Sequence, residues 1–164
     1  MDSAPGNEWL RIRRGGIRPL ERDPHAPLSV RSPFVIEIDY WNLHEGARLA
    51  LSVNVYNECG VLLFNGGPSH EQVYGGQPLP AALMRDACHV PGDLLNDGVH
   101  RTELYVMRGN DVIFHDADFL SFTIADSAQL RGEWFGKWPG AVRPHLRWIT
   151  TPIALLPLSD GTAS

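Results

Sequence analysis

Strict alternation of apolar and polar residues over short runs is the feature that most restricts the fold of this chain. One run covers residues 33–43, with Phe34, Ile36, Ile38 and Tyr40 on one side and Val35, Glu37, Asp39 and Trp41 on the other. A second covers residues 47–57, with Leu49, Leu51, Val53 and Val55 against Ala50, Ser52, Asn54 and Tyr56. A period of two residues is that of a β-strand with one buried face, so both runs are predicted strands.

Shorter stretches of the same kind fill most of the remaining sequence. Strands are predicted at residues 61–64, 81–90, 99–108 and 111–124, the last with a kink at 116–118, and a bulged edge strand at 9–18. Glycine, proline and asparagine mark the turns between them, and the loop at 65–80 is expected to be the most mobile part. With about seven or eight strands and no amphipathic helix, the chain is predicted to be all-β, an antiparallel β-sandwich of immunoglobulin-like or jelly-roll type.

A chain of 164 residues is long enough to bury one core, so we predict a single β-sandwich domain over residues 1–164. Its core is expected at 31–126. An aromatic strap follows at 131–148, RGEWFGKWPGAVRPHLRW, where glycine and proline interrupt both strand and helix periods. Its rings are expected to lie against the sandwich. The apolar tail, 149–164, contains Pro152 and Pro157 and is predicted to be a packed or exchanged extension.

Charge and missing motifs exclude several function classes. A formal net charge of -5 argues against a nucleic-acid partner. The sequence has no phosphate-binding loop, dinucleotide fingerprint, zinc-protease helix or serine-hydrolase elbow, so neither catalysis nor a cofactor is predicted. Six early arginines suggest either an anion-contacting face or a solvated edge strand: Arg11, Arg13, Arg14, Arg18, Arg22 and Arg31.

The cysteines and the N-terminal residues bear on the cellular compartment. Only Cys59 and Cys88 are present, so no disulfide framework is predicted and a reducing compartment fits. The first ten residues have no apolar run typical of a secretory signal, and no stretch is apolar enough to span a bilayer. We expect a cytoplasmic protein.

The outward positions of the predicted strands carry aromatic, acidic and amide side chains together. A pyranose ring stacks its C–H face on an aromatic ring, and its hydroxyls need fixed donors and acceptors. We therefore predict one carbohydrate-binding surface on an open sheet face, beside the small residues Ala50 and Ser52. Its residues are Glu37, Asp39, Trp41, Asn54, Tyr56, Arg101, Glu103 and Tyr105.

Other interpretations of these residues stay open. The same positions are compatible with an ordinary polar sheet face, or with Trp41 buried beneath the strap. Glu37 and Glu103 suggest a glycosidase acid and base, although no cleft is evident from the sequence. His115, Asp116 and Asp118 have ligand chemistry for a metal, but at a strand kink a solvated turn is favoured, and no metal site is predicted.

Five segments resemble the Wzt C-terminal domain family when taken in order. They are SPFVIEIDYW, LALSVNVYNECGVLLF, HVPGDLLNDGVHRTELYV, DFLSFTIAD and RGEWFGKWPGAVRPHLRW, which together span residues 31–148. The resemblance implies a β-sandwich that lies behind the ATPase domain of an ABC transporter and recognises an exported O-antigen or related polysaccharide. It also implies a homodimer formed by exchange of a terminal strand. In the last segment, Gly140, Val142, Pro144 and Trp148 match family positions and are expected to be structural.

The chain departs from the usual arrangement of the family in one respect, because this sequence lacks the ATPase domain. Coupling to transport is therefore expected through a separate ATPase and permease, or through a neighbouring domain, which places the protein at the inner face of the membrane. The family has no invariant catalytic motif. Because related modules also occur beside glycosyltransferases and methyltransferases, an assembly or adaptor domain in glycan biosynthesis, and less so a glycan-processing enzyme, remain alternatives.

Overall fold

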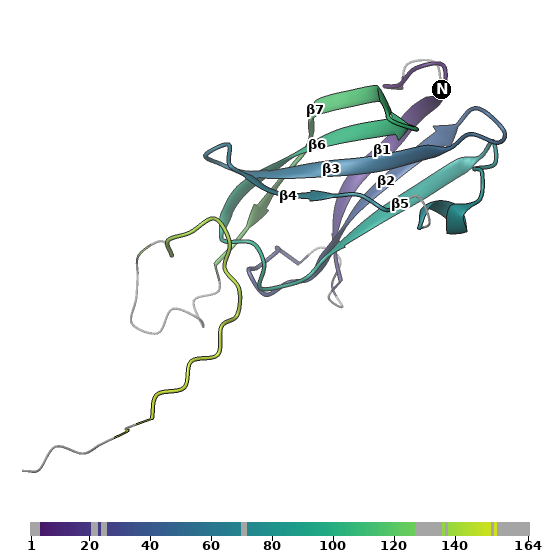
Figure 1. Ribbon diagram of the computed structural model, residues 1–164. Coiled ribbons are helices and arrows are strands. Elements are labelled where there is room, and N and C mark those ends of the chain that lie inside the picture. Colours follow the sequence, from purple (N-terminus) through teal and green to yellow (C-terminus); the bar gives the residue numbers. More distant parts are fainter. Residues whose placement is uncertain are drawn as a thin grey trace, which may run out of the picture.

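A computed structural model describes residues 4–20, 23, 26–69, 72–126, 136, 138–151 and 153. This part of the chain contains strands and one short 3-10 helix (Figure 1). They are β1 (Leu10–Pro19), β2 (Phe34–Asn42), β3 (Leu49–Asn57), β4 (Leu62–Gly66), η1 (Val73–Gly76), β5 (Leu83–Val90), β6 (Gly98–Arg108) and β7 (Asp111–Ile124). Every strand falls within one or two residues of a predicted range, and η1 lies in the predicted loop at 65–80.

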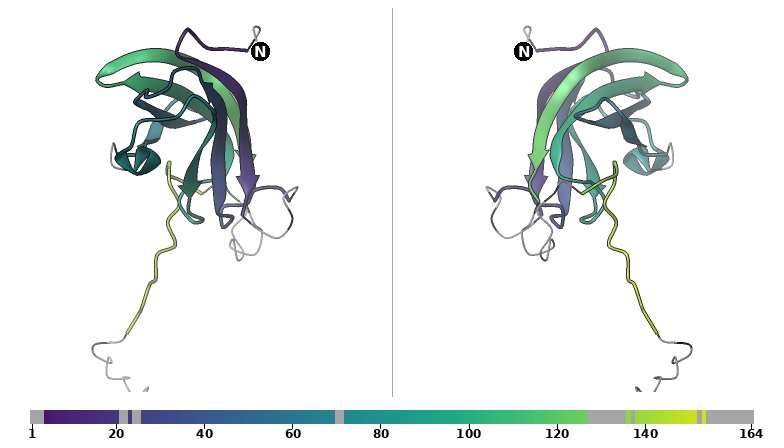
Figure 2. Two further views of the ribbon diagram at one scale, coloured as in Figure 1. Left: turned by 90° about the vertical axis from the view of Figure 1, so that its right-hand side faces the viewer. Right: turned by 90° about the vertical axis from the view of Figure 1, so that its left-hand side faces the viewer.

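The strands form two antiparallel sheets that face each other, as the two edge-on views show (Figure 2). One sheet has the order β1-β2-β5 and the other β4-β3-β6-β7. This is the immunoglobulin-like arrangement with the fourth strand placed in the second sheet. The predicted antiparallel β-sandwich is confirmed.

The core lies between the sheets and is made by the alternating residues of the central strands. From β2, Phe34, Ile36, Ile38 and Tyr40 are at most 3% exposed, and they face Leu51, Val53, Leu104 and Val106 of β3 and β6, which are equally buried. Fully burying one such side chain stabilises the fold by about 1.5–3 kcal/mol. Period-two patterning therefore fixes which side of each strand points inward.

A glycine closes the sandwich where the edge strands β1 and β7 approach each other. The pairing of β1 with β2 shifts between Ile12 and Arg14, and the pairing of β7 with β6 shifts near the predicted kink. Gly15 follows the first shift, and a Cβ atom at this position would lie 2.4 Å from Cζ of Phe119. A glycine inside a strand is normally unfavourable, but here any larger residue would force the Phe119 ring to move.

The strap and the tail differ from expectation. Near residues 138–142 the chain returns to the sandwich, because Val142 bridges Leu95 and Asn96 Nδ2 donates to the carbonyl oxygens of Trp138 and Gly140, each at 2.8 Å. Trp148, Ile149 and Ile153, by contrast, are 87%, 70% and 101% exposed, and this segment extends away from the sheets (Figure 1). The expectation that the strap's rings all cover the sandwich is therefore wrong for Trp148. Residues 131–135, 137, 152 and 154–164 of the strap and tail lie outside the described residues.

Within the described ranges, no helix has the length and apolarity needed to cross a lipid bilayer.

Candidate functional site

The eight predicted site residues lie on two opposite surfaces. Three are on β2, in the outer face of the three-stranded sheet: Glu37, Asp39 and Trp41. Five are on β3 and β6, in the outer face of the four-stranded sheet: Asn54, Tyr56, Arg101, Glu103 and Tyr105. The outer faces of a sandwich point in opposite directions, so the expected single surface is wrong. The reason is that β2 and β3 are consecutive in sequence but belong to different sheets.

Strand pairing brings the five residues on the four-stranded sheet together around Glu103. Asn54 pairs with Glu103 and Tyr56 pairs with Arg101, across β3 and β6. On the other side, His115 of β7 pairs with Tyr105. We call these six residues the Glu103 cluster: Asn54, Tyr56, Arg101, Glu103, Tyr105 and His115.

Hydrogen bonds fix the Glu103 carboxylate. Its Oε2 accepts from Oη of Tyr105 at 2.9 Å, from Oη of Tyr56 at 3.0 Å and from Nδ2 of Asn54 at 3.4 Å, while its Oε1 accepts from Arg101 at 3.3 Å. Partial desolvation alone would raise the pKa of Glu103, but these donors outweigh it and hold the pKa below its usual value. The carboxylate is therefore ionised at neutral pH and held in one orientation.

Aromatic contacts extend the cluster sideways. The Arg101 guanidinium lies 4.6 Å from the centroid of the Tyr56 ring, and the Tyr105 ring stacks on His115 with centroids 4.2 Å apart. At the β4 side, Asn65 Nδ2 donates to Ser52 Oγ at 2.8 Å and to Asn54 Oδ1 at 2.7 Å. The face thus carries ordered rings, amides and a carboxylate across all four strands of the sheet.

Sequence reasoning missed the part that His115 plays, because it placed this residue in a solvated turn with Asp116 and Asp118, with a metal site as the less favoured alternative. His115 belongs instead with Tyr105, whereas Asp116 pairs with Leu104. In the part of the chain that the structure describes, no three acidic, histidine or cysteine side chains are grouped as a metal site requires. The alternation of β7 up to residue 115 was the available signal, but the kink hid the register.

Glu37, Asp39 and Trp41 have different surroundings on the opposite face. Glu37 and Asp39 are only 7% and 6% exposed because arginines from β1 and β5 cover them. Trp41 pairs with Leu83 at the start of β5, whereas the described strap contacts residues 94–96 beyond the other end of that strand. Trp41 is therefore not beneath the described part of the strap.

The glycosidase pair suggested by the sequence does not fit this geometry. Glu37 and Glu103 project from opposite outer faces, and the sheets of a sandwich are themselves about 10 Å apart. A glycosidase needs its two carboxyl groups on either side of one bond, within about 10 Å. These two residues cannot act together on a single substrate.

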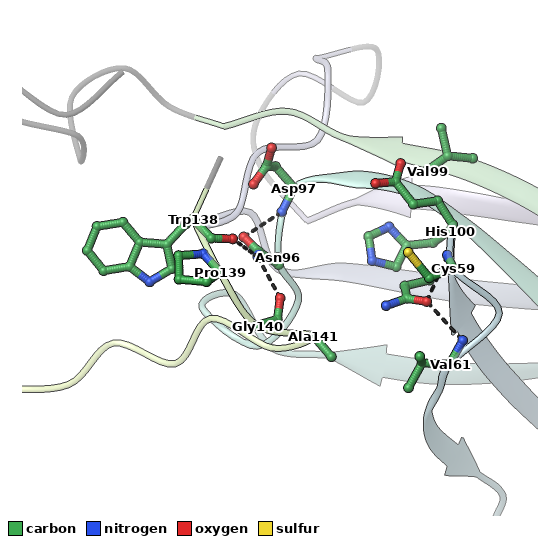
Figure 3. A pocket seen from close by; sticks show the side chains of 12 residues that line it. Cys59, Val61, Asn96, Asp97, Val99, His100, Trp138, Pro139, Gly140 and Ala141 are labelled. Carbon is green, nitrogen blue, oxygen red and sulfur yellow. Dashed lines mark hydrogen bonds between the residues drawn. The ribbon is translucent and has the colours of Figure 1, made fainter. Parts of the chain in front are cut away.

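A separate hollow lies at one end of the sandwich (Figure 3). It has a volume of about 520 Å³ and is bounded by the turn at 57–61, by residues 96–100, where the chain enters β6, and by residues 138–141. Asn96 lies between Trp138 and Gly140, with Cys59 and Val61 on the far side (Figure 3). Three of the segments behind the family resemblance therefore converge here, although they are far apart in sequence.

Comparison with solved structures supports the fold. The crystal structure of the C-terminal domain of Wzt superposes with a TM-score of 0.63 at 12% identity, over 89% of this chain and 86% of that one. A bacterial adhesin from Mobiluncus mulieris gives 0.47 at 9% identity, over 73% and 58%. A β-glucuronidase from Parabacteroides merdae gives 0.41 at 11% identity, over 71% and 13%. Models of known protein families give no match, and neither do curated proteins.

The molecule is thus an immunoglobulin-like antiparallel β-sandwich with an ordered polar and aromatic outer face. More particularly, its fold is similar to that of the Wzt C-terminal domain over most of both chains.

Proposed function

We propose that the protein is a non-catalytic carbohydrate-binding module that recognises a cell-surface polysaccharide of the O-antigen type for export by an ABC transporter. The observation that carries the proposal is the Glu103 cluster, in which four donors hold one carboxylate among two tyrosines on an accessible sheet face. Sugar recognition needs ring surfaces for C–H faces and oriented polar groups for hydroxyls. The fold, which is similar to that of the Wzt C-terminal domain, is the one that the resemblance of the sequence to that family implies, and this supports the proposal.

An open face of this kind favours weak binding to a repeating polymer. With few groups and no deep enclosure, we expect a dissociation constant in the micromolar to millimolar range, or about 4 to 8 kcal/mol. Such affinity suits a module that must release its glycan during transport. A separate ATPase and permease are the proposed partners, which would hold the protein in the cytoplasm at the inner face of the membrane.

The proposal is tested by titrating the surface polysaccharide of the source organism into the protein by calorimetry. Replacing Tyr105 by alanine removes a stacked ring and a donor to Glu103, and should weaken binding at least about tenfold. Tyr74→Ala is the matched control, because Tyr74 is exposed on η1. Equal binding by wild type, Tyr105→Ala and Glu103→Gln would show that this face is not the glycan site.

A second candidate function is an assembly or adaptor domain, and the exposed tail supports it. Trp148, Ile149 and Ile153 present apolar surface that the described part of this chain does not cover. A second copy that exchanged its terminal strand would bury them, giving the homodimer proposed above. Removing all residues after Trp148 and measuring mass in solution tests this idea. If the tail forms the interface, the truncated protein should be a monomer with glycan binding unchanged. A truncated protein with the same number of subunits as the full chain would contradict the adaptor function.

A further inference from the structure

The outer face of the three-stranded sheet presents arginines whose guanidinium groups are held by two carboxylates of the central strand β2. Arg85 donates to both oxygens of Asp39 through Nε and Nη2, at 2.6 and 2.8 Å. Arg18 bonds one Glu37 oxygen through the same two atoms, at 2.9 and 2.8 Å. Arg14 reaches both acids, because its Nη2 lies 3.5 Å from Oε2 of Glu37 and its Nε lies 3.6 Å from Oδ2 of Asp39. Each carboxylate therefore fixes guanidinium groups rather than facing solvent.

The strand register explains this arrangement. Arg14 of β1 and Arg85 of β5 pair with Asp39 from opposite sides. Their hydrogen bonding and charge, Arg85 first, hold the pKa of Asp39 below its usual value, although burial opposes the shift. Asp39 thus stays ionised and keeps both arginines oriented across the strip between β1 and β5.

Cations outnumber anions on this face. We call it the arginine face and define it by the outward arginines of β1 and β5: Arg11, Arg13, Arg14, Arg18 and Arg85. Only Glu37 and Asp39 oppose them within the sheet. Arg13 is exposed at the bulge, and no hydrogen bond or ion pair links it to another described residue, although its charge acts on Asp39. The chain as a whole carries -5, so this positive excess is local.

Donor capacity and space remain for a ligand. A guanidinium has five N–H groups, and Arg85 uses two of its nitrogen atoms on Asp39. Between the arginines, Gly16 and Ala87 flank Glu37 across the sheet, and a Cβ at Gly16 would have nothing within 4 Å. The result is a shallow strip, about 10 Å wide over three strands, with oriented cations along it.

We propose that the arginine face binds the carboxylate groups of an acidic polysaccharide, so that the recognised glycan is a polyuronate-like chain. This rests on the proposed function and names its substrate class. Arginine forks match carboxylates with two parallel hydrogen bonds, and their pre-orientation by Glu37 and Asp39 lowers the entropy lost on binding. A narrow strip on a protein of net negative charge suits one extended chain better than a broad anionic membrane, which the rest of the surface would repel.

The test uses fluorescent polygalacturonate oligomers as the probe and anisotropy as the measurement. Arg13→Gln keeps every ion pair of this face and should weaken binding about two- to fivefold. The double variant Arg13→Gln with Arg14→Gln should weaken binding up to about 25-fold. Arg48→Gln removes the same charge at an exposed site whose side chain donates a hydrogen bond to Gly76 and forms no ion pair with a described residue, and it should have no effect. Dextran, which is neutral, should not bind here. Raising the salt concentration should weaken the polygalacturonate complex.

Several outcomes would overturn the inference. The first is that the wild type does not bind polygalacturonate. The second is that Arg48→Gln weakens binding as much as Arg13→Gln does. The third is binding to phosphatidylglycerol vesicles but not to polygalacturonate. Loss of host-polysaccharide binding through Tyr105→Ala, with the arginine variants unaffected, would keep the proposed function and remove only this inference. Arginine-dependent binding of the host polysaccharide that is as tight in Tyr105→Ala and Glu103→Gln as in the wild type would support the inference and refute the Glu103 cluster as a glycan site.

Discussion

Replacing Asp86 by asparagine should stabilise the protein at neutral pH. Asp86 lies on β5 opposite Ile38, on the inner side of the sheet, and lines a cleft of about 750 Å³ between β5 and β4. Leu51 and Val53 form part of the apolar lining of this cleft. Burial raises the pKa of Asp86 from 3.8 to about 6. A shift of about two units means that ionising this carboxyl costs the folded protein about 3 kcal/mol at most.

The sign of the pH dependence follows from proton binding. Between about pH 4 and pH 6, the folded carboxyl keeps its proton while the unfolded one has lost it. The free energy of unfolding therefore falls as pH rises through this window and stays lower above it. An asparagine side chain has no such titration and resembles the protonated acid, so Asp86→Asn should match the wild type near pH 4. At pH 7 the variant should be more stable by up to about 3 kcal/mol.

Urea unfolding at pH 4, 5, 6 and 7 measures this difference. Glu103 and Asp39 have lowered pKa values, so the stability they provide is lost only as pH falls through those values, equally in both proteins. Asp111→Asn, at an exposed hairpin position, is the matched control for replacing one carboxylate by an amide. A stability difference for Asp86→Asn that stays constant from pH 4 to 7, or a loss of stability at pH 7, would refute the reasoning.

Three further variants test other features. Gly15→Ala should destabilise by about 1–3 kcal/mol through its clash with Phe119, and Phe119→Leu should relieve part of that loss in a double-mutant cycle. Tyr105→Phe removes a donor from Glu103, so the pKa of Glu103 should rise toward its usual value in an NMR titration, whereas an unchanged value would contradict the hydrogen-bond argument. Asn96→Ala should speed proteolysis near Trp138 while lowering stability by only about 1–2 kcal/mol, and unchanged cleavage would mean that other contacts hold this segment.

Local alternation was enough to predict the strands and their buried sides. In β3 every second residue is apolar and buried, and the alternate apolar residues of β2 face the same core, although Val35, Glu37 and Asp39 on the other side of β2 are buried as well. The hydrophobic effect acts residue by residue, so a period-two pattern carries this information without knowledge of the neighbours. The edge position and bulge of β1 were also predictable, because glycines interrupt its pattern and charged residues line it.

Sheet membership was not predictable in the same way. Glu37 on β2 and Asn54 on β3 both occupy outward positions in the pattern, yet the connection between these strands crosses from one sheet to the other. Which strands pair depends on long-range contacts, such as β2 with β5 and β3 with β6, that no short pattern encodes. The kink in β7 hid the register of His115 for a related reason, because extra residues shift the pairing with β6.

Cross-strand neighbours, rather than residue type, decide what each outward acid does. Glu103 has tyrosine, asparagine and a single arginine around it, so its charge orders neutral donors and rings suited to hydroxyl groups. Glu37 lies beside the arginines of β1, so its charge is covered and the surface that remains is cationic. Two glutamates with the same alternating pattern therefore produce faces of opposite preference. If both proposals hold, one sandwich engages the hydroxyl groups of a glycan on one side and its carboxylates on the other.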